Sequence, residues 1–400
     1  MNKQPIHRVF KVVIHIFYGE KMKICVTSAS GVEAVTKREI YRLLQVDAPA
    51  ISGRLCFEGG WEEIAKCNMY LRTANRVGII LGEFNAETFD DLFDGLKQIA
   101  FEEYIPFDGK IIVTAKNVLS KLFAISATQS ISKKAICQRL FDKYKVSSLP
   151  ETGERYKVEI AILKDHVTVT LDTSGDGLHR RGYRGLVGEA PLKETLASAI
   201  IQLSVWNPSR PLADVFCGSG TIPIEAALIA LNIASGKNRT FDFVEWKCFD
   251  RSIFDRVKQE AIEGETLDRE IRISGFDVDE SQLKLARRHA REAGVEKYIH
   301  FQRADMRDFS SRFSHGVIIS NPPYGERLAD RKQIEVLYRD YGKMVASLDK
   351  WCAYTLTSVT DFERLFGKRA DKKRKLYNGK LECNVFAHLS EPPKKREENK

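Results

Sequence analysis

The chain has 400 residues, of which 43% are hydrophobic and 29% are charged. This length allows two or three compact domains, and the composition excludes a disordered or collagen-like chain. No apolar run approaches the roughly 20 residues that a membrane-spanning helix needs, which excludes an integral membrane protein. The 63 basic residues outnumber the 54 acidic ones by nine. This excess favours a polyanion such as nucleic acid as partner, although a basic surface without such a partner fits the charge equally well.

The eight cysteines are scattered, with no Cys-x-x-Cys pair and no histidine cluster beside them. This pattern argues against a zinc site and a disulfide framework, and it fits a reducing cytoplasm. Residues 1–21 lack the small-residue cleavage site of a signal peptide, and a clear strand pattern begins at Met22. We therefore expect a cytoplasmic protein without a metal, in which residues 1–21 are an extension outside the folded domains.

Residues 22–170 alternate short β-branched runs with amphipathic stretches, a pattern typical of an α+β domain with an antiparallel sheet. We expect strands at residues 23–27, 53–57, 76–84, 110–115, 156–163 and 166–171, and helices at residues 31–44, 90–100 and 130–144.

A glycine-rich stretch at residues 182–190 indicates a boundary, so we assign residues 171–190 to a linker and residues 191–388 to a second domain. Pro191 suits the first turn of the helix that opens this domain. Strands and helices then alternate, which predicts a parallel, doubly wound sheet with a ligand site beyond the carboxyl ends of its strands. We expect strands at residues 213–216, 271–276, 299–303 and 317–320, and helices at residues 192–203, 222–231 and 282–293. Residues 389–400 form a basic, polar tail.

The first strand of that domain passes into a helix through a Gly-Ser-Gly turn. Glycines at 218 and 220 allow positive φ and let a ligand approach the backbone beside the positive end of the helix. The Gly-Lys-Ser/Thr of a phosphate-binding loop is absent, which argues against phosphate binding at this turn, and a turn that merely reverses the chain is the alternative to a ligand site. The candidate cofactor residues in this stretch are Asp214, Phe216, Cys217, Gly218, Ser219, Gly220 and Thr221.

Acidic residues follow the next two predicted strands. Asp277 ends the second strand, where a carboxylate can accept both ribose hydroxyls of a nucleoside cofactor. Asp279 is better suited to cap the following helix. Asp305 follows the third strand and is a candidate acceptor for an adenine amine, although an aspartate in this position is more often a turn residue.

Residues 321–325, Asn-Pro-Pro-Tyr-Gly, follow the fourth strand. Prolines at 322 and 323 fix φ and remove two backbone donors, which leaves a corner rich in hydrogen-bond acceptors. The Asn321 Oδ1 atom and the Pro322 carbonyl can both accept from one NH₂ group, and the Tyr324 ring offers a stacking face for a planar base. The four residues 321–324 are therefore the candidate catalytic group.

Together, residues 216–221, 275–279 and 321–325 resemble the motifs of class I S-adenosylmethionine-dependent methyltransferases that act on exocyclic amines. Residues 71–77, 120–123 and 133–136 resemble a THUMP domain, an RNA-binding module, and residues 178–184 with 190–194 resemble the junction of the same family. The likeness spans residues 22–388 and implies a Rossmann-like α/β methyltransferase domain after a ferredoxin-like and THUMP region. It also implies S-adenosylmethionine as cofactor and guanine N2 of large-subunit (23S) ribosomal RNA as target. Val215 and Ser235 depart from prolines common in the family, which bears on loop rigidity more than on chemistry.

Methyl transfer to an amine needs no metal, and no general base is evident in the sequence. RNA delivery would rest on basic residues of the N-terminal half and the junction, namely Lys121, Lys133, Lys134, Arg139, Arg180, Arg181 and Arg184. A methyltransferase for adenine N6 in DNA or RNA shares the Asn321 motif, but the DNA enzyme would need a target-recognition insertion that this chain has no room for. A non-catalytic RNA-binding protein would have lost the acceptor corner, which is intact here.

Overall fold

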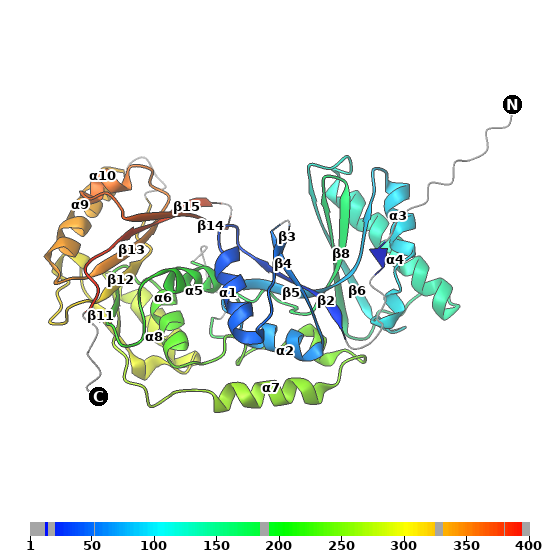
Figure 1. Cartoon of the computed structure of the whole chain (residues 1–400), viewed down its shortest axis with the longest axis horizontal. Helices are drawn as coiled ribbons and strands as arrows, with labels where there is room; N and C mark the ends of the chain where they lie inside the picture. The colour runs from blue at the N-terminus through cyan, green and yellow to red at the C-terminus, as the bar shows by residue number, and fades with distance from the viewer. Residues whose placement is uncertain are drawn as a thin grey trace.

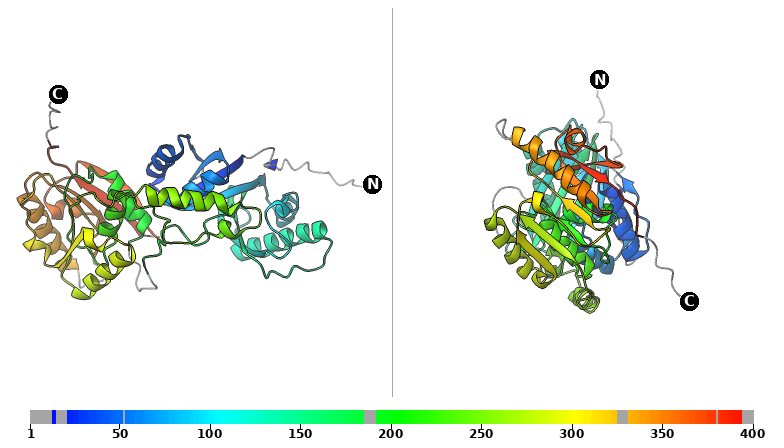
Figure 2. Two further views of the ribbon diagram at one scale, coloured as in Figure 1. Left: turned by 90° about the horizontal axis from the view of Figure 1, so that it is seen from below. Right: turned by 90° about the vertical axis from the view of Figure 1, so that its left-hand side faces the viewer.

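The computed structural model describes residues 13–14, 21–51, 53–184, 192–324, 331–379 and 381–393. Figure 1 shows two sheets, one in the N-terminal half of the chain on the right and one in the C-terminal half on the left. Figure 2 shows that the molecule is elongated, with the two halves at its opposite ends.

The N-terminal sheet has eight strands in the order β3-β4-β2-β5-β8-β7-β6, with β1 paired to β5. Its strands are β1 (Val13–Ile14), β2 (Met22–Ser28), β3 (Ala50–Ile51), β4 (Arg54–Gly59), β5 (Ala74–Asn85), β6 (Lys110–Val118), β7 (Arg155–Leu163) and β8 (His166–Asp172). Its helices are α1 (Glu33–Leu44), α2 (Trp61–Tyr70), α3 (Phe89–Lys97) and α4 (Ile125–Tyr144). All the strands and helices expected in this half are present, but the sheet is mixed because β6 and β7 run parallel.

Alternation along the strands divides the side chains between the two faces of this sheet. In β2, Met22, Ile24 and Val26 point into the large core of the N-terminal half, while Cys25 packs in a small separate cluster with Cys56 and Ile80. Side chains that alternate in this way place every second residue on the same face of the sheet. Residues 13–14 of the expected N-terminal extension pair with β5, so this part of the extension belongs to the sheet.

The C-terminal sheet has seven strands in the order β11-β10-β9-β12-β13-β15-β14. The first five are parallel, β15 runs antiparallel to β13, and β14 runs antiparallel to β15. The strands are β9 (Leu212–Asp214), β10 (Ile273–Asp277), β11 (Ile299–Arg303), β12 (Val317–Ser320), β13 (Cys352–Thr357), β14 (Lys372–Asn378) and β15 (Leu381–His388). The helices are α5 (Glu194–Leu203), α6 (Thr221–Ala230), α7 (Arg251–Glu263), α8 (Glu280–Glu292), α9 (Arg331–Ser347) and α10 (Phe362–Phe366). The predicted doubly wound, mostly parallel sheet is thus confirmed.

One segment of the C-terminal half belongs to the core of the N-terminal half. Residues between α6 and β10, including Phe243, Trp246 and Phe254, pack in the same core as β2 and β7. Trp246 stacks on Tyr156 of β7 at 5.0 Å between ring centroids. In Figure 1, α7 lies directly below α2, and the two helices are in contact. The two halves therefore share a core that the sequence assigned to the N-terminal domain alone.

The expected linker at residues 171–190 is largely packed where the structure describes it. Leu171 and Asp172 belong to β8, Leu178 lies in the N-terminal core, and Tyr183 lies in the C-terminal core. Residues 185–190 and Pro191 lie outside the described residues. Among the described residues, no helix is long and apolar enough to cross a membrane.

Candidate methyltransferase site

Four predicted site segments meet at one edge of the C-terminal sheet. Strands β11, β10, β9 and β12 are neighbours and run parallel, so their carboxyl ends lie side by side. Asp277 and Asp214 are the last residues of β10 and β9, and Asn321 directly follows β12. The point where the order reverses, between β9 and β12, is where open α/β sheets bind their ligands.

Two glycines shape the turn that joins β9 to α6. Gly218 has φ +49°, and a side chain there would meet no atom within 4 Å, so its backbone faces open space. Gly220 has φ +85° and caps α6, and a Cβ atom there would lie 3.0 Å from the Cβ of Ala286 on α8. The first glycine thus leaves room for a ligand, and the second lets α8 pack closely beneath the turn.

Asp214 is buried at the end of β9, with 1% of its surface exposed. Its Oδ1 atom accepts from the backbone N–H of Phe216 at 3.1 Å, and the Ser320 hydroxyl, which also accepts from Val215 N at 3.1 Å, bonds to the same carboxyl. Burial raises the pKa of Asp214 to about 7. The side chain therefore ties β9 to β12 directly beneath the turn and does not face a ligand.

Asp277 closes the turn from the neighbouring strand. Its Oδ2 atom accepts from Gly218 N at 2.8 Å, and its Oδ1 atom accepts from Asp279 N at 3.0 Å. Each oxygen keeps a lone pair, which suits the two ribose hydroxyls of a nucleoside. Asp279 caps α8 through Ser281 N at 2.8 Å, which confirms the capping role expected for it. Asp305 caps a short 3-10 helix (Met306–Asp308) and pairs with Arg307 at 2.9 Å, so its contact with adenine stays a prediction.

The acceptor corner after β12 is anchored by two tyrosines. The Tyr324 hydroxyl donates to Asn321 Oδ1, and the Tyr338 hydroxyl of α9 donates to the Pro323 carbonyl at 3.0 Å. Burial raises the pKa of Tyr324, so its hydroxyl remains a donor at neutral pH. Pro322 is buried, and none of the described residues donates to its carbonyl oxygen. The corner thus holds two fixed acceptors, while Gly325 lies outside the described residues.

Three supporting residues were missed by sequence reasoning. Ser320 links Asp214 to the corner, Tyr338 holds Pro323, and His289 of α8 places Nδ1 3.1 Å from the Ser219 carbonyl oxygen. Burial lowers the pKa of His289, so the ring is neutral and can donate to that oxygen through Nδ1. The sequence could have indicated Ser320, because it directly precedes the motif at residues 321–325. Tyr338 and His289 lie far from that motif and from the glycine turn in the sequence, and only the fold brings them to the site.

Arg181 is one of the predicted RNA contacts, and that prediction is wrong. Its side chain is 2% exposed and pairs with the fully buried Glu225 of α6 at 3.3 Å. Glu225 also accepts from the Tyr183 hydroxyl at 3.1 Å and from Ser198. Arg181 in turn donates to the carbonyl oxygen of Arg72 in the N-terminal half. This buried network is out of reach of RNA. It joins the two halves beside the turn between β9 and α6, which we call the cofactor turn after the ligand predicted for it.

The other residues predicted to contact RNA fall into two groups, those held by other parts of the protein and those exposed to solvent. Arg184 does not face solvent but contacts Ser219 and Thr221 in the cofactor turn. Lys133 pairs with Glu151 at 2.6 Å, and Arg139 forms two hydrogen bonds with Glu102. Exposed members of the set are Lys121, which pairs with Glu87 at 2.6 Å, Lys134, and Arg180, which lies 3.5 Å from Asp176. RNA contact by these three stays a prediction.

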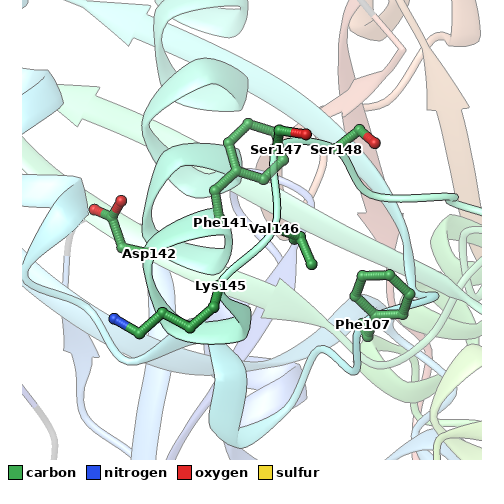
Figure 3. Close-up of a pocket in the computed structure, with 7 residues that line it drawn as sticks. All are labelled: Phe107, Phe141, Asp142, Lys145, Val146, Ser147 and Ser148. Atoms are coloured by element: carbon green, nitrogen blue, oxygen red, sulfur yellow. The ribbon is translucent and has the colours of Figure 1, made fainter.

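A shallow hollow of about 830 Å³ lies at the C-terminal end of α4. Figure 3 shows its lining, which is Phe107, Phe141, Asp142, Lys145, Val146, Ser147 and Ser148. All of these residues belong to the N-terminal half, whereas the strand ends with the glycine turn and the acceptor corner belong to the C-terminal sheet. The hollow is therefore separate from the methyl-transfer site. Within the described ranges, no group of three or more His, Cys, Asp or Glu side chains could hold a metal ion.

Comparison with known families defines the class of protein. Residues 181–387 match the model of the RMKL-like methyltransferase domain, residues 23–78 match the RlmL ferredoxin-like domain, and residues 86–172 match the THUMP domain. The chain is an S-adenosylmethionine-dependent RNA methyltransferase whose THUMP domain serves RNA binding. It belongs to the RlmL-like, THUMP-containing methyltransferase family.

Three similar proteins show which kinds of enzyme the chain resembles within this family. It is 41% identical over 384 residues to YpsC of Bacillus subtilis, a provisionally named RNA methyltransferase, covering 95% of this chain and all of that protein. It is 32% identical over 378 residues to the ribosomal RNA large subunit methyltransferase K/L of Syntrophotalea carbinolica, covering 91% of this chain and 53% of that one. It shares 44% identity and a TM-score of 0.88 with the methyltransferase-like protein SMU.472, solved with S-adenosylhomocysteine, over 94% of this chain and all of that one.

Proposed function

We propose that the protein methylates the exocyclic N2 amine of a guanine in large-subunit (23S) ribosomal RNA, in the cytoplasm. The observation that carries the proposal is the corner at Asn321 and Pro322, whose two acceptors lie beside the glycine turn. The similarity to the K/L enzyme, whose name specifies large-subunit ribosomal RNA, supports the choice of RNA. The residues at the strand ends fit S-adenosylmethionine, since Gly218 leaves open space beside Asp277.

Bound S-adenosylmethionine supplies a methyl group on a sulfonium, which an amine takes by in-line displacement. An aromatic amine is a poor nucleophile because its lone pair is delocalised into the ring. Two hydrogen bonds from its N–H groups to Asn321 Oδ1 and the Pro322 carbonyl would favour a more tetrahedral nitrogen and direct its lone pair at the methyl. As the N–C bond forms, the S–C bond breaks, and the amine then releases one proton to solvent.

The Tyr324 ring would hold the unstacked guanine. It is half-buried and packs against the core of the C-terminal sheet, which fixes the plane of the ring. Its hydroxyl donates to the same Asn321 oxygen that would accept from guanine, so we assign it a second role in orienting the amide.

Loss of N2-methylguanosine from 23S ribosomal RNA is the expected result of deleting the gene. Nucleoside mass spectrometry of large-subunit RNA from the deletion strain and its parent measures it, with re-expression of the parental protein as the control. Unchanged N2-methylguanosine together with a loss of N6-methyladenosine would replace this proposal with the adenine-N6 alternative, which uses the same acceptor corner.

Lys134 and Arg180 are proposed as phosphate contacts because both side chains are exposed. Each phosphate contact releases condensed cations, which gives log K a negative slope against log salt. Substituting both residues by alanine should therefore make this slope less negative by about 2. Filter binding of 23S RNA fragments between low and moderate salt measures the slope. Lys284→Ala removes another exposed lysine, on α8, and should leave the slope unchanged. An unchanged slope in the double variant would place RNA on another surface.

A further inference from the structure

Arg184 reaches from the junction of the two halves into the cofactor turn. Its side chain is 13% exposed, and its Nη2 atom donates to the hydroxyls of Ser219 and Thr221. Its Nη1 atom donates to the Leu192 carbonyl at 3.3 Å and lies 3.2 Å from Glu194 Oε1. The Nε atom is buried and has no partner among the described residues. Glu194 thus occupies one edge of the guanidinium, while the opposite edge rests on two neutral hydroxyls.

The turn that receives Arg184 is also the start of α6. Gly220 caps this helix without a side-chain hydrogen bond, and Thr221 is the first helical residue. The N-terminus of a helix carries partial positive charge and free N–H groups, both of which favour an anion. A guanidinium and a helix N-terminus therefore converge on the same side of the turn.

We infer that Arg184, with Thr221 at the start of α6, binds the α-carboxylate of the methionine part of S-adenosylmethionine. Asp277 on β10 suits the ribose, and the acceptor corner at Asn321 after β12 suits the incoming amine. The turn between β9 and α6 lies between these two positions, so we assign it to the amino-acid end of the cofactor. A guanidinium forms stronger, two-pronged hydrogen bonds with a carboxylate than with hydroxyls. The ligand would thus replace the hydroxyl contacts of Arg184. This inference rests on the use of S-adenosylmethionine and is independent of which RNA base is methylated.

Calorimetry with three ligands tests it on the full-length protein. S-adenosylhomocysteine carries the whole amino acid, decarboxylated S-adenosylmethionine lacks the carboxylate, and 5′-methylthioadenosine lacks the amino-acid end. Arg184→Ala should weaken S-adenosylhomocysteine about tenfold to a hundredfold, as expected for hydrogen bonds between charged groups, and change the other two affinities less than twofold. Arg184→Lys keeps the charge but not the paired donors, and should lie between the parent and the alanine variant.

Two matched variants make the outcome decisive. Asp277→Ala should weaken all three ligands by a similar factor, because each carries the ribose. Arg288→Ala removes an exposed cation from α8, where it pairs with Glu292, and should bind all three ligands as the parent does. If Arg184→Ala weakens all three ligands equally, Arg184 supports the shape of the turn and the carboxylate assignment is wrong. If it weakens none of them, Arg184 has no role in cofactor binding.

Discussion

Asn321→Ala should slow methyl transfer about a hundredfold or more, roughly 3 kcal/mol of barrier, while affinity for S-adenosylmethionine stays nearly unchanged. Asn321 follows β12, whereas Asp277 and the glycine turn belong to β10 and the β9–α6 connection. The lost acceptor acts mainly while the amine is attacking, so its removal raises the barrier more than it weakens ground-state binding. Single-turnover methylation of 23S RNA, beside cofactor titrations, measures both quantities.

Tyr324→Phe refines this test. Sequence reasoning alone indicates that the ring suffices and that phenylalanine retains most activity. The hydroxyl, however, donates to Asn321 Oδ1, so we now expect a loss of roughly threefold to tenfold, the effect of one ordinary hydrogen bond. An Asn321→Ala enzyme that methylates at the parental rate would remove the protein from the amine-methylating class. Equal rates for Tyr324→Phe and the parent would show that only the ring of Tyr324 contributes and that its hydroxyl does not.

Glu225→Gln should lower the free energy of unfolding by about 3 kcal/mol. Glutamine keeps an acceptor oxygen for only one of Tyr183 and Ser198, which donate to different oxygens of Glu225, and it leaves the Arg181 guanidinium, which is 2% exposed, without its ion-pair partner. Removing one partner of a buried ion pair typically costs about 3–5 kcal/mol because the remaining charge is not solvated. Urea unfolding followed by circular dichroism measures the change.

The double variant Arg181→Met/Glu225→Gln separates the charge from the packing. If the unpaired guanidinium causes the loss, replacing it with an apolar chain should recover most of the stability. Glu292→Ala breaks the exposed pair with Arg288 and should change the unfolding free energy by less than about 1 kcal/mol. A Glu225→Gln protein as stable as this control would contradict a structural role for the network.

The shared core also changes how the RNA-binding half can be studied. Phe243, Trp246 and Phe254 of the C-terminal half lie in the same core as β2 and β7, so removing the N-terminal half would expose them to water. Aromatic side chains of this size contribute several kcal/mol when they are buried. Substitutions of exposed cations in the intact chain therefore test RNA binding more cleanly than truncation does.

Local pattern in the sequence was enough to predict the strand ends at which the candidate cofactor residues lie. Strands β11 and β12 match their predicted bounds. β12 is a short, fully buried apolar run, and β11 begins with an alternation of buried and exposed residues, and both patterns encode a strand directly. Gly218, Asp277 and Asn321 were identified for the same reason, since each ends or follows such a strand. Parallel strands then bring their carboxyl ends to one edge without further information.

The partners of the cations were decided by the tertiary structure alone. Arg181 and Arg184 lie in a glycine-flanked basic stretch that is typical of a solvated surface, yet one pairs with Glu225 and the other contacts Thr221. Those partners are 44 and 37 residues away in the chain. A charged side chain carries no local periodicity, so its burial depends on which distant residue the fold places against it. The bridging role of α7 was also missed, because α2, which it contacts, belongs to the N-terminal half and lies far from it in the sequence.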